Sequence, residues 1–271
     1  MLIPLADVPR WYAERKPADS IAVSHGADAL TWHELERRAN ARARAFAAKG
    51  VKPGDFVAIG LPNSNAFFET TFAVWKCGAT PTSLSWRLPR GEAAAVLEIL
   101  KPSLVVGGEA DWNAPNSLPV NFVPEGFSGE PLDAPVARYW KAMTSGGSTG
   151  RPKVILDHNP AVIETTTPLM LGIPHQASLL NPGPLYHNAP FILSHSALFG
   201  GGKLTGMVKF DAEETLRLIA EISMGTGALA MIGGTVVVVG FLTLFTGGTI
   251  AVQGYSSLAN IGVEALTGFF S

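Results

Sequence analysis

Apolar side chains recur at helical spacing directly after a capping signal in the first part of the chain. Between Leu35 and Phe46 they return every three to four residues. The preceding sequence, Thr31-Trp32-His33-Glu34, has a hydroxyl and a carboxylate three residues apart, which is typical of a capping box at a helix start. Gly50 is a favourable residue for the end of such a helix. The pattern therefore predicts a helix between Thr31 and Gly50.

Short apolar runs alternate with further helical patterns after this helix. The predicted strands are 56–60, 80–83 and 104–106, and the predicted helices between them are 64–77 and 90–100. This β-α-β rhythm predicts an α/β fold, in which layered parallel or mixed sheets are flanked by helices.

The middle of the chain is less regular. Residues 111–135 are rich in Pro, Gly, Asn and Ser, which predicts a loop with short β segments. Further along, the pattern predicts strands at 136–143 and 154–156, an extended segment at 203–208, and helices at 160–167, 189–198 and 211–221.

Charge divides the chain into two regions. The net charge is −2, from 20 basic and 22 acidic residues, and beyond residue 221 Glu264 alone is charged. We therefore expect one domain at 1–221 and a separate hydrophobic segment at 222–271.

The near-neutral balance argues against the clustered basic face of a nucleic-acid-binding protein. The N-terminus lacks the pattern of a signal peptide, which predicts a cytoplasmic protein, and the single cysteine, Cys77, predicts a small buried residue.

A loop rich in glycine and hydroxyl side chains lies between two predicted strands. Glycines let the backbone fold around a polyphosphate so that several N–H groups form an anion nest, while hydroxyl and cationic side chains add donors and charge. The candidate phosphate-binding residues are Thr144, Ser145, Gly146, Gly147, Ser148, Thr149, Gly150 and Lys153.

Two other interpretations of this loop are open. Gly146–Gly150 matches the Gly-x-Ser-x-Gly elbow of α/β-hydrolases, and a surface loop needs no ligand at all. The elbow must lead into a helix, but Pro152 and the apolar run 154–156 predict a strand. A Walker A loop is disfavoured as well, because two residues separate Gly150 from Lys153.

The loop resembles the signature loop of the AMP-binding superfamily, which includes acyl-CoA synthetases, luciferases and the adenylation domains of peptide synthetases. Other segments resemble conserved boxes of this superfamily in the same order along the chain. They are Leu30–Leu35, Gly54–Ile59, Trp75–Ala79 and Pro184–Ala189. The resemblance covers residues 5–221 and implies the N-terminal domain of the adenylate-forming fold.

The resemblance also implies a reaction, that of an ATP-dependent, AMP-forming CoA ligase for a fatty acid or a similar carboxylic acid. The carboxylate attacks the α-phosphate of ATP to give an acyl-adenylate and pyrophosphate, and the thiol of CoA then displaces AMP. The loop Thr144–Lys153 would hold the β- and γ-phosphates, with Mg²⁺ arriving with ATP rather than in a site built by protein side chains. His187 would be a catalytic residue beside the acyl pocket, although a histidine near Tyr186 and Phe191 also suits a hydrogen-bonded core.

Segments that carry the remaining chemistry of this superfamily are not found after Glu221. They are a Tyr-Gly-x-Thr-Glu segment, a Tyr-Arg-Thr-Gly-Asp segment and a C-terminal domain with a catalytic lysine. The resemblance therefore implies a truncated, catalytically incomplete ligase from which most of the CoA site is missing.

The tail has a different character. Residues 224–252 are uncharged and outnumber the roughly 20 apolar residues that span a bilayer, although Val236–Val239 also suits a buried β-rich core. The tail resembles the start of YrbE/MlaE-type permeases of lipid-transport ABC systems. The matching segments are Ala220–Ser223, Ile232–Thr235, Ala251–Tyr255 and Ile261–Gly268. The alternative function is thus a fragment of such a permease fused to a ligase remnant, either membrane-associated through 224–252 or non-functional.

Overall fold

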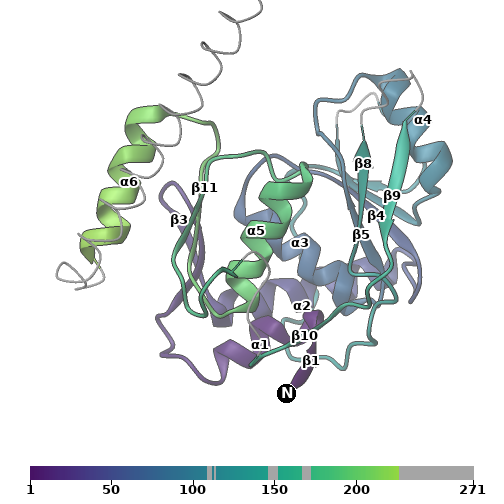
Figure 1. The fold of residues 1–271 in the computed structure, drawn as a ribbon. Helices are drawn as coiled ribbons and strands as arrows, with labels where there is room; N and C mark the ends of the chain where they lie inside the picture. Colours follow the sequence, from purple (N-terminus) through teal and green to yellow (C-terminus); the bar gives the residue numbers. More distant parts are fainter. Residues whose placement is uncertain (109–111, 113, 146–151, 167–171, 226–271) are drawn as a thin grey trace, which may run out of the picture. The chain divides into compact units, whose positions relative to one another are not determined.

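The computed structural model describes residues 1–108, 112, 114–145, 152–166 and 172–225. The chain divides into two units, Met1–Thr215 and Leu216–Ser271. Of the predicted hydrophobic segment 222–271, residues 226–271 lie outside the described residues. Figure 1 shows how the helices and strands of the first unit are arranged.

A six-stranded sheet in the first unit has the order β7-β6-β4-β5-β8-β9. β7, β6, β4, β5 and β8 run parallel, and β9 is antiparallel to β8. The strands are β4 (Phe56–Gly60), β5 (Thr80–Ser83), β6 (Leu104–Gly107), β7 (Ser117–Leu118), β8 (Lys141–Ser145) and β9 (Lys153–Asp157). This mixed sheet with its flanking helices confirms the predicted layered α/β fold.

Helices cover both faces of this sheet, because successive side chains of a strand point to opposite faces. Val57 and Ile59 of β4 belong to one hydrophobic cluster together with α3 (Asn65–Lys76). Ala58, which lies between them, belongs to a second cluster together with α4 (Arg90–Leu100). The unbroken apolar run that predicted this strand is therefore explained by burial on both faces.

Two smaller sheets complete the first unit. A four-stranded sheet has the order β11-β12-β2-β3, with β11, β12 and β2 parallel and β3 antiparallel to β2. A two-stranded antiparallel sheet joins β1 to β10. The strands are β1 (Leu2–Pro4), β2 (Ile21–His25), β3 (Asp28–Thr31), β10 (Val162–Glu164), β11 (Leu179–Asn181) and β12 (Leu204–Gly206).

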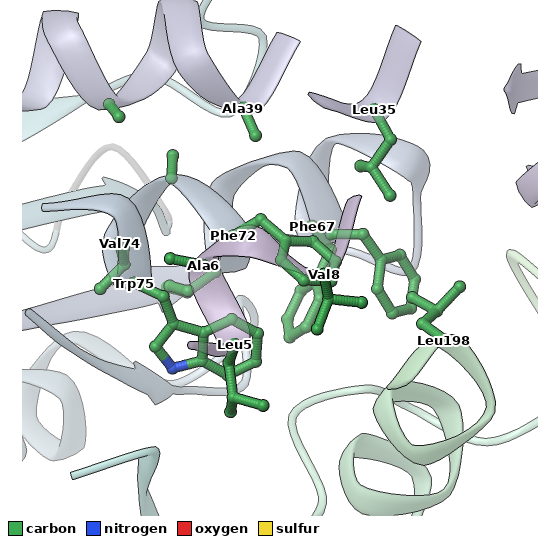
Figure 2. Close-up of a cluster of buried hydrophobic side chains, with 14 of the residues drawn as sticks. Leu5, Ala6, Val8, Leu35, Ala39, Phe67, Phe72, Val74, Trp75 and Leu198 are labelled. Carbon is green, nitrogen blue, oxygen red and sulfur yellow. The ribbon is translucent and has the colours of Figure 1, made fainter. Parts of the chain in front are cut away.

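The largest hydrophobic cluster surrounds α3, as Figure 2 shows. Leu35 and Ala39 of α2 (Trp32–Ala48) and Leu198 of α5 (Asn188–Phe199) pack around this helix, together with side chains of η1 (Leu5–Asp7) and α1 (Val8–Ala13). The aromatic side chains of α3, among them Phe67, Phe72 and Trp75, are fully buried. Because α3 contacts strands of both larger sheets, its aromatic side chains form the centre of the unit.

The predicted capping box is present at the start of α2. The amide of Glu34 donates to Thr31 Oγ1 at 3.2 Å, and the amide of Thr31 donates to Glu34 Oε2 at 2.8 Å. Such a cap contributes about 1 kcal/mol to helix stability. Cys77 is buried as predicted, and burial raises the pKa of its thiol to about 12.

Two predicted elements are wrong in whole or in part. The helix expected at 160–167 is instead the strand β10, because β-branched Val162 and Ile163 pair with the N-terminal strand β1, a partner far away in sequence. The strand expected at 136–143 begins later, at Lys141. Trp140 accounts for part of this difference, because its carbonyl accepts a 2.7 Å hydrogen bond from Trp75 Nε1.

The helices expected at 189–198 and 211–221 are confirmed as α5 and α6 (Ala212–Gly225). Among the residues that the structure describes, no helix is both long and apolar enough to cross a membrane. The expected membrane segment 224–252 extends almost entirely beyond these residues.

Candidate functional site

The predicted phosphate loop joins two neighbouring antiparallel strands. In the register of β8 and β9, Ser145 lies opposite Lys153 and Thr144 lies opposite Val154. Lys153 is exposed and Thr144 is half-buried at the mouth of this hairpin. Gly146, Gly147, Ser148, Thr149 and Gly150 lie outside the described residues. The structure therefore brings together Thr144, Ser145 and Lys153, the two ends of the predicted loop.

The element after the loop distinguishes between the competing interpretations. A nucleophile elbow and a Walker A loop both lead directly into a helix. Here the chain enters β9 at Lys153 and pairs with β8 along five residues. The nucleophile elbow and the Walker A loop are thus excluded, and the predicted strand after the loop is confirmed.

The hairpin mouth lies at the edge of the sheet where ligands usually bind. Because β4, β5, β6 and β8 are parallel, their carboxyl ends, Gly60, Ser83, Gly107 and Ser145, lie at one edge. Ligands of open α/β sheets bind outside this edge. At this edge exposed Lys153 offers a cation and half-buried Thr144 offers a hydroxyl donor, each at the loop end of its strand, and both groups suit a bound polyphosphate.

The second predicted site residue, His187, lies on a different element. It is the N-cap of α5, with φ −88° and ψ 149°, and its carbonyl accepts from the amide of Phe191 at 3.1 Å. Its side chain is exposed, and its ring centroid lies 4.6 Å from that of Tyr186. The interpretation of His187 as a buried core residue is therefore wrong, and the imidazole is accessible to a ligand.

A buried lysine links the hairpin to the helix that begins after His187. Lys141 Nζ lies 2.9 Å from Asn188 Oδ1 and 3.6 Å from Asp157 Oδ2. Lys141 and Asp157 are paired at the base of the hairpin, four residues before Ser145. Four strand residues span about 13 Å. The contact between Lys141 and Asn188 therefore joins α5 to the end of the hairpin that is farther from the loop.

Burial and charge affect the two ionisable groups of this link. Burial lowers the pKa of the Lys141 amino group, although the charge of Asp157 opposes this effect. Burial raises the pKa of Asp157, but hydrogen bonds from Trp140 and Asn159 and the charge of Lys141 outweigh it, so the pKa is lowered. The lowered pKa keeps the Asp157 carboxylate ionised at neutral pH beside the Lys141 amino group.

Sequence reasoning missed Lys141 and Asn188. The available signal was a single cation within the apolar run Trp140-Lys141-Ala142-Met143.

In the described part of the chain, no three His, Cys, Asp or Glu side chains are grouped so that they could hold a metal ion.

Comparison with known proteins gives matches over most of the first unit. Residues 9–134 match the family model described as AMP-binding enzyme. Feruloyl-CoA synthases from Amycolatopsis and Streptomyces species are 31% identical over 219 residues, which is 76% of this chain and 45% of each relative. Malformin synthetase from Aspergillus brasiliensis is 34% identical over 161 residues, or 56% of this chain and 3% of that protein. The chain thus spans less than half the length of these relatives.

Solved structures share the fold. The N-terminal domain of FACL13 from Mycobacterium tuberculosis has a TM-score of 0.69 at 20% identity, covering 80% of this chain and 60% of that one. O-succinylbenzoate coenzyme A synthetase from Bacillus subtilis, in complex with AMP, has a TM-score of 0.67 at 19% identity, covering 82% and 60%. The family model ends at residue 134, so it does not test the predicted permease-like tail.

Proposed function

We propose that this chain, whose N-terminal part is an AMP-binding domain of the adenylate-forming type, is the ATP-binding portion of an AMP-forming carboxylate–CoA ligase. The observation that carries the proposal is the β8–β9 hairpin, which places Thr144 and Lys153 at the carboxyl edge of the six-stranded sheet. Feruloyl-CoA synthase and O-succinylbenzoate coenzyme A synthetase are both named for carboxylic acids, which supports an acid of the acyl or aryl class as substrate.

Each group in the hairpin has a role in this proposal. The ammonium of Lys153 neutralises the β- and γ-phosphates of ATP, and Thr144 adds a hydroxyl donor. The glycines of the loop supply backbone N–H groups, and Mg²⁺ enters with the nucleotide. The acid attacks the α-phosphate and pyrophosphate leaves, so donors fixed around the phosphates stabilise the charge that develops. CoA is the acceptor in the second step, and His187 lies beside the acid.

Replacement of Lys153 by alanine is expected to weaken ATP binding about tenfold, because one charge-assisted contact to phosphate is lost. Titration calorimetry with Mg-ATP measures this change directly. ATP–pyrophosphate exchange with a panel of fatty and aromatic acids then tests the chemistry and identifies the acid.

Lys209→Ala is the matched control for this experiment, because Lys209 is also an exposed lysine of the first unit. The control is expected to bind ATP like the unaltered protein. Equal affinity of the Lys153→Ala protein and its control for ATP would show that the hairpin is not the phosphate site.

A second proposal concerns the tail and rests on its sequence alone. We infer that residues 224–252 contact a lipid bilayer, as expected of a permease-like segment, because the stretch is uncharged and long. The full chain is then expected to float with phosphatidylcholine vesicles in a density gradient. Val237→Lys with Val239→Lys should abolish flotation, because each lysine costs about 3 kcal/mol in a bilayer. The control changes exposed Val120 and Val123 to lysine, and flotation lost equally in both proteins would contradict the inference.

A further inference from the structure

Lys141 is a buried cation that joins three elements of the fold. It is the first residue of β8, it faces Asp157 at the end of β9, and it donates to Asn188 at the start of α5. Its side chain is 8% exposed, and its amino group lies 4.8 Å from the centroid of the Trp140 ring. The contact therefore fixes the base of the hairpin relative to the beginning of α5.

This arrangement is not what stability alone favours. A buried ammonium loses its hydration, and an apolar side chain of similar size is often equally stable at such a site. Asn188 is also the first residue of α5, and a cation is electrostatically unfavourable near the N-terminus of a helix. Asp157 offsets part of both costs, at 3.6 Å from the amino group. A local arrangement that lowers stability often marks a functional constraint.

The neighbouring residues suggest what that constraint is. Asn188 directly follows His187, and the amide of Phe191 is bonded to the His187 carbonyl, so an anchored Asn188 also fixes the backbone at His187. At the other end of the same hairpin, Ser145 and Lys153 lie at the mouth of the proposed phosphate loop. One short strand, β8, therefore connects the group that anchors His187 to the loop.

We propose that Lys141 is a positioning residue, which through its bond to Asn188 holds His187 at a fixed place relative to the β8–β9 hairpin, whose strands end at Ser145 and begin at Lys153 beside the proposed phosphate loop. This inference rests on the proposed function, since it assigns Lys141 to the placement of the acid beside the nucleotide. Lys141 touches neither substrate. It acts through the backbone of α5, so its loss should affect the acid more than ATP.

The test compares Lys141→Met and Asn188→Leu with the double variant. Each single change removes the same hydrogen bond to a charged group, and is expected to raise the KM for the acid in pyrophosphate exchange about tenfold. The Kd for Mg-ATP should stay within about twofold, and the double variant should be no worse than either single one. Lys141→Arg, which keeps a cationic donor, should restore part of the loss. Single effects that add in the double variant would overturn the proposal.

A second measurement separates this proposal from the proposed function. In protein labelled with ¹³C-histidine, the ring signal of His187, assigned with His187→Gln, should move in Lys141→Met and in Asn188→Leu. The signal should not move in Lys203→Met, which removes an exposed lysine. This readout needs no activity, so it still decides the matter if the protein neither binds ATP nor exchanges pyrophosphate. A His187 signal unmoved in both single variants overturns the positioning role.

Discussion

Replacement of His195 by leucine is expected to make the first unit less sensitive to mild acid. His195 lies in α5 and is fully buried, and aromatic rings of the described residues surround it. They belong to Phe67, Phe68, Phe72, Trp75, Phe191 and Phe199. Its Nδ1 donates to the carbonyl of Phe191 at 2.8 Å, and among the residues that the structure describes its buried Nε2 has no hydrogen-bond partner. Protonation would therefore place a cation in an apolar environment.

The direction of the pH effect follows from this environment. Burial lowers the pKa of His195 from 6.5 to about 3, against a smaller opposing effect of the Phe191 carbonyl. Between these values the unfolded chain binds a proton that the folded protein does not, so stability falls as pH falls from 6.5 toward 3. From pH 6.5 to pH 4.5 the loss is roughly 2–3 kcal/mol, a large part of the stability of an ordinary domain.

Urea unfolding followed by tryptophan fluorescence at several pH values measures this loss. At pH 7.5 the leucine variant should lie within about 1.5 kcal/mol of the unaltered protein, because leucine fills a similar volume and leaves no orphan nitrogen. Toward pH 4.5 its free energy of unfolding should fall less steeply. His33→Leu, an exposed histidine, is the control and should keep the original slope. If the free energy of unfolding depended on pH equally in both variants, the pKa of His195 would not change on unfolding.

The elements predicted correctly from the sequence are those whose signals are local. The capping box at Thr31 and Glu34, the apolar run of β4 and the aromatic spacing of α3 each lie within one element, and all three are confirmed. Pro152 and the run after it correctly predicted that the loop leads into a strand. The layered α/β fold follows from the alternation of such elements.

The elements missed or mistaken depend on partners far away in sequence. Val162 and Ile163 became a strand because β1 pairs with them, and nothing near them in sequence indicates that partner. The role of Lys141 is equally non-local, since Asn188 lies 47 residues away. Both strands of the β8–β9 hairpin were predicted, although with other bounds, whereas the link from this hairpin to α5 required the structure.

Buried ion pairs are another feature that the hydrophobic pattern of the sequence could not reveal. Glu36 of α2 and Lys76 of α3 carry side chains that are 9% and 0% exposed. Lys76 Nζ donates to Glu36 Oε1 at 3.0 Å and lies 2.9 Å from Oε2, and Asn40 also donates to Oε1 at 3.0 Å. A charged residue in a helix is normally exposed, so sequence reasoning assigns such residues to the solvent face.

Glu36→Gln is expected to lower the free energy of unfolding by about 3 kcal/mol, because the ammonium of Lys76 then stays buried without its paired carboxylate. Burial already lowers the pKa of Lys76, and the charge of Glu36 opposes this, so removing that charge lowers the pKa further. The unfolded chain then binds the proton more strongly than the folded one. The variant should therefore regain stability as pH rises toward 10, which is the same sign of pH dependence as at His195 but in the alkaline range.

Lys76→Met in the Glu36→Gln background should restore part of this loss, because the uncompensated ammonium is removed and two neutral groups remain between α2 and α3. The control is Glu14→Gln, which breaks the contact with Arg15 between side chains that are 60% and 45% exposed. An exposed pair of this kind contributes about 0–1 kcal/mol, so the control should change little. Urea unfolding of the unaltered protein, the single variants Glu36→Gln and Lys76→Met, and the double variant gives the coupling energy directly. If the double variant were less stable than Glu36→Gln alone, the ammonium would be adequately solvated without Glu36, and the buried pair would not be what holds α2 against α3.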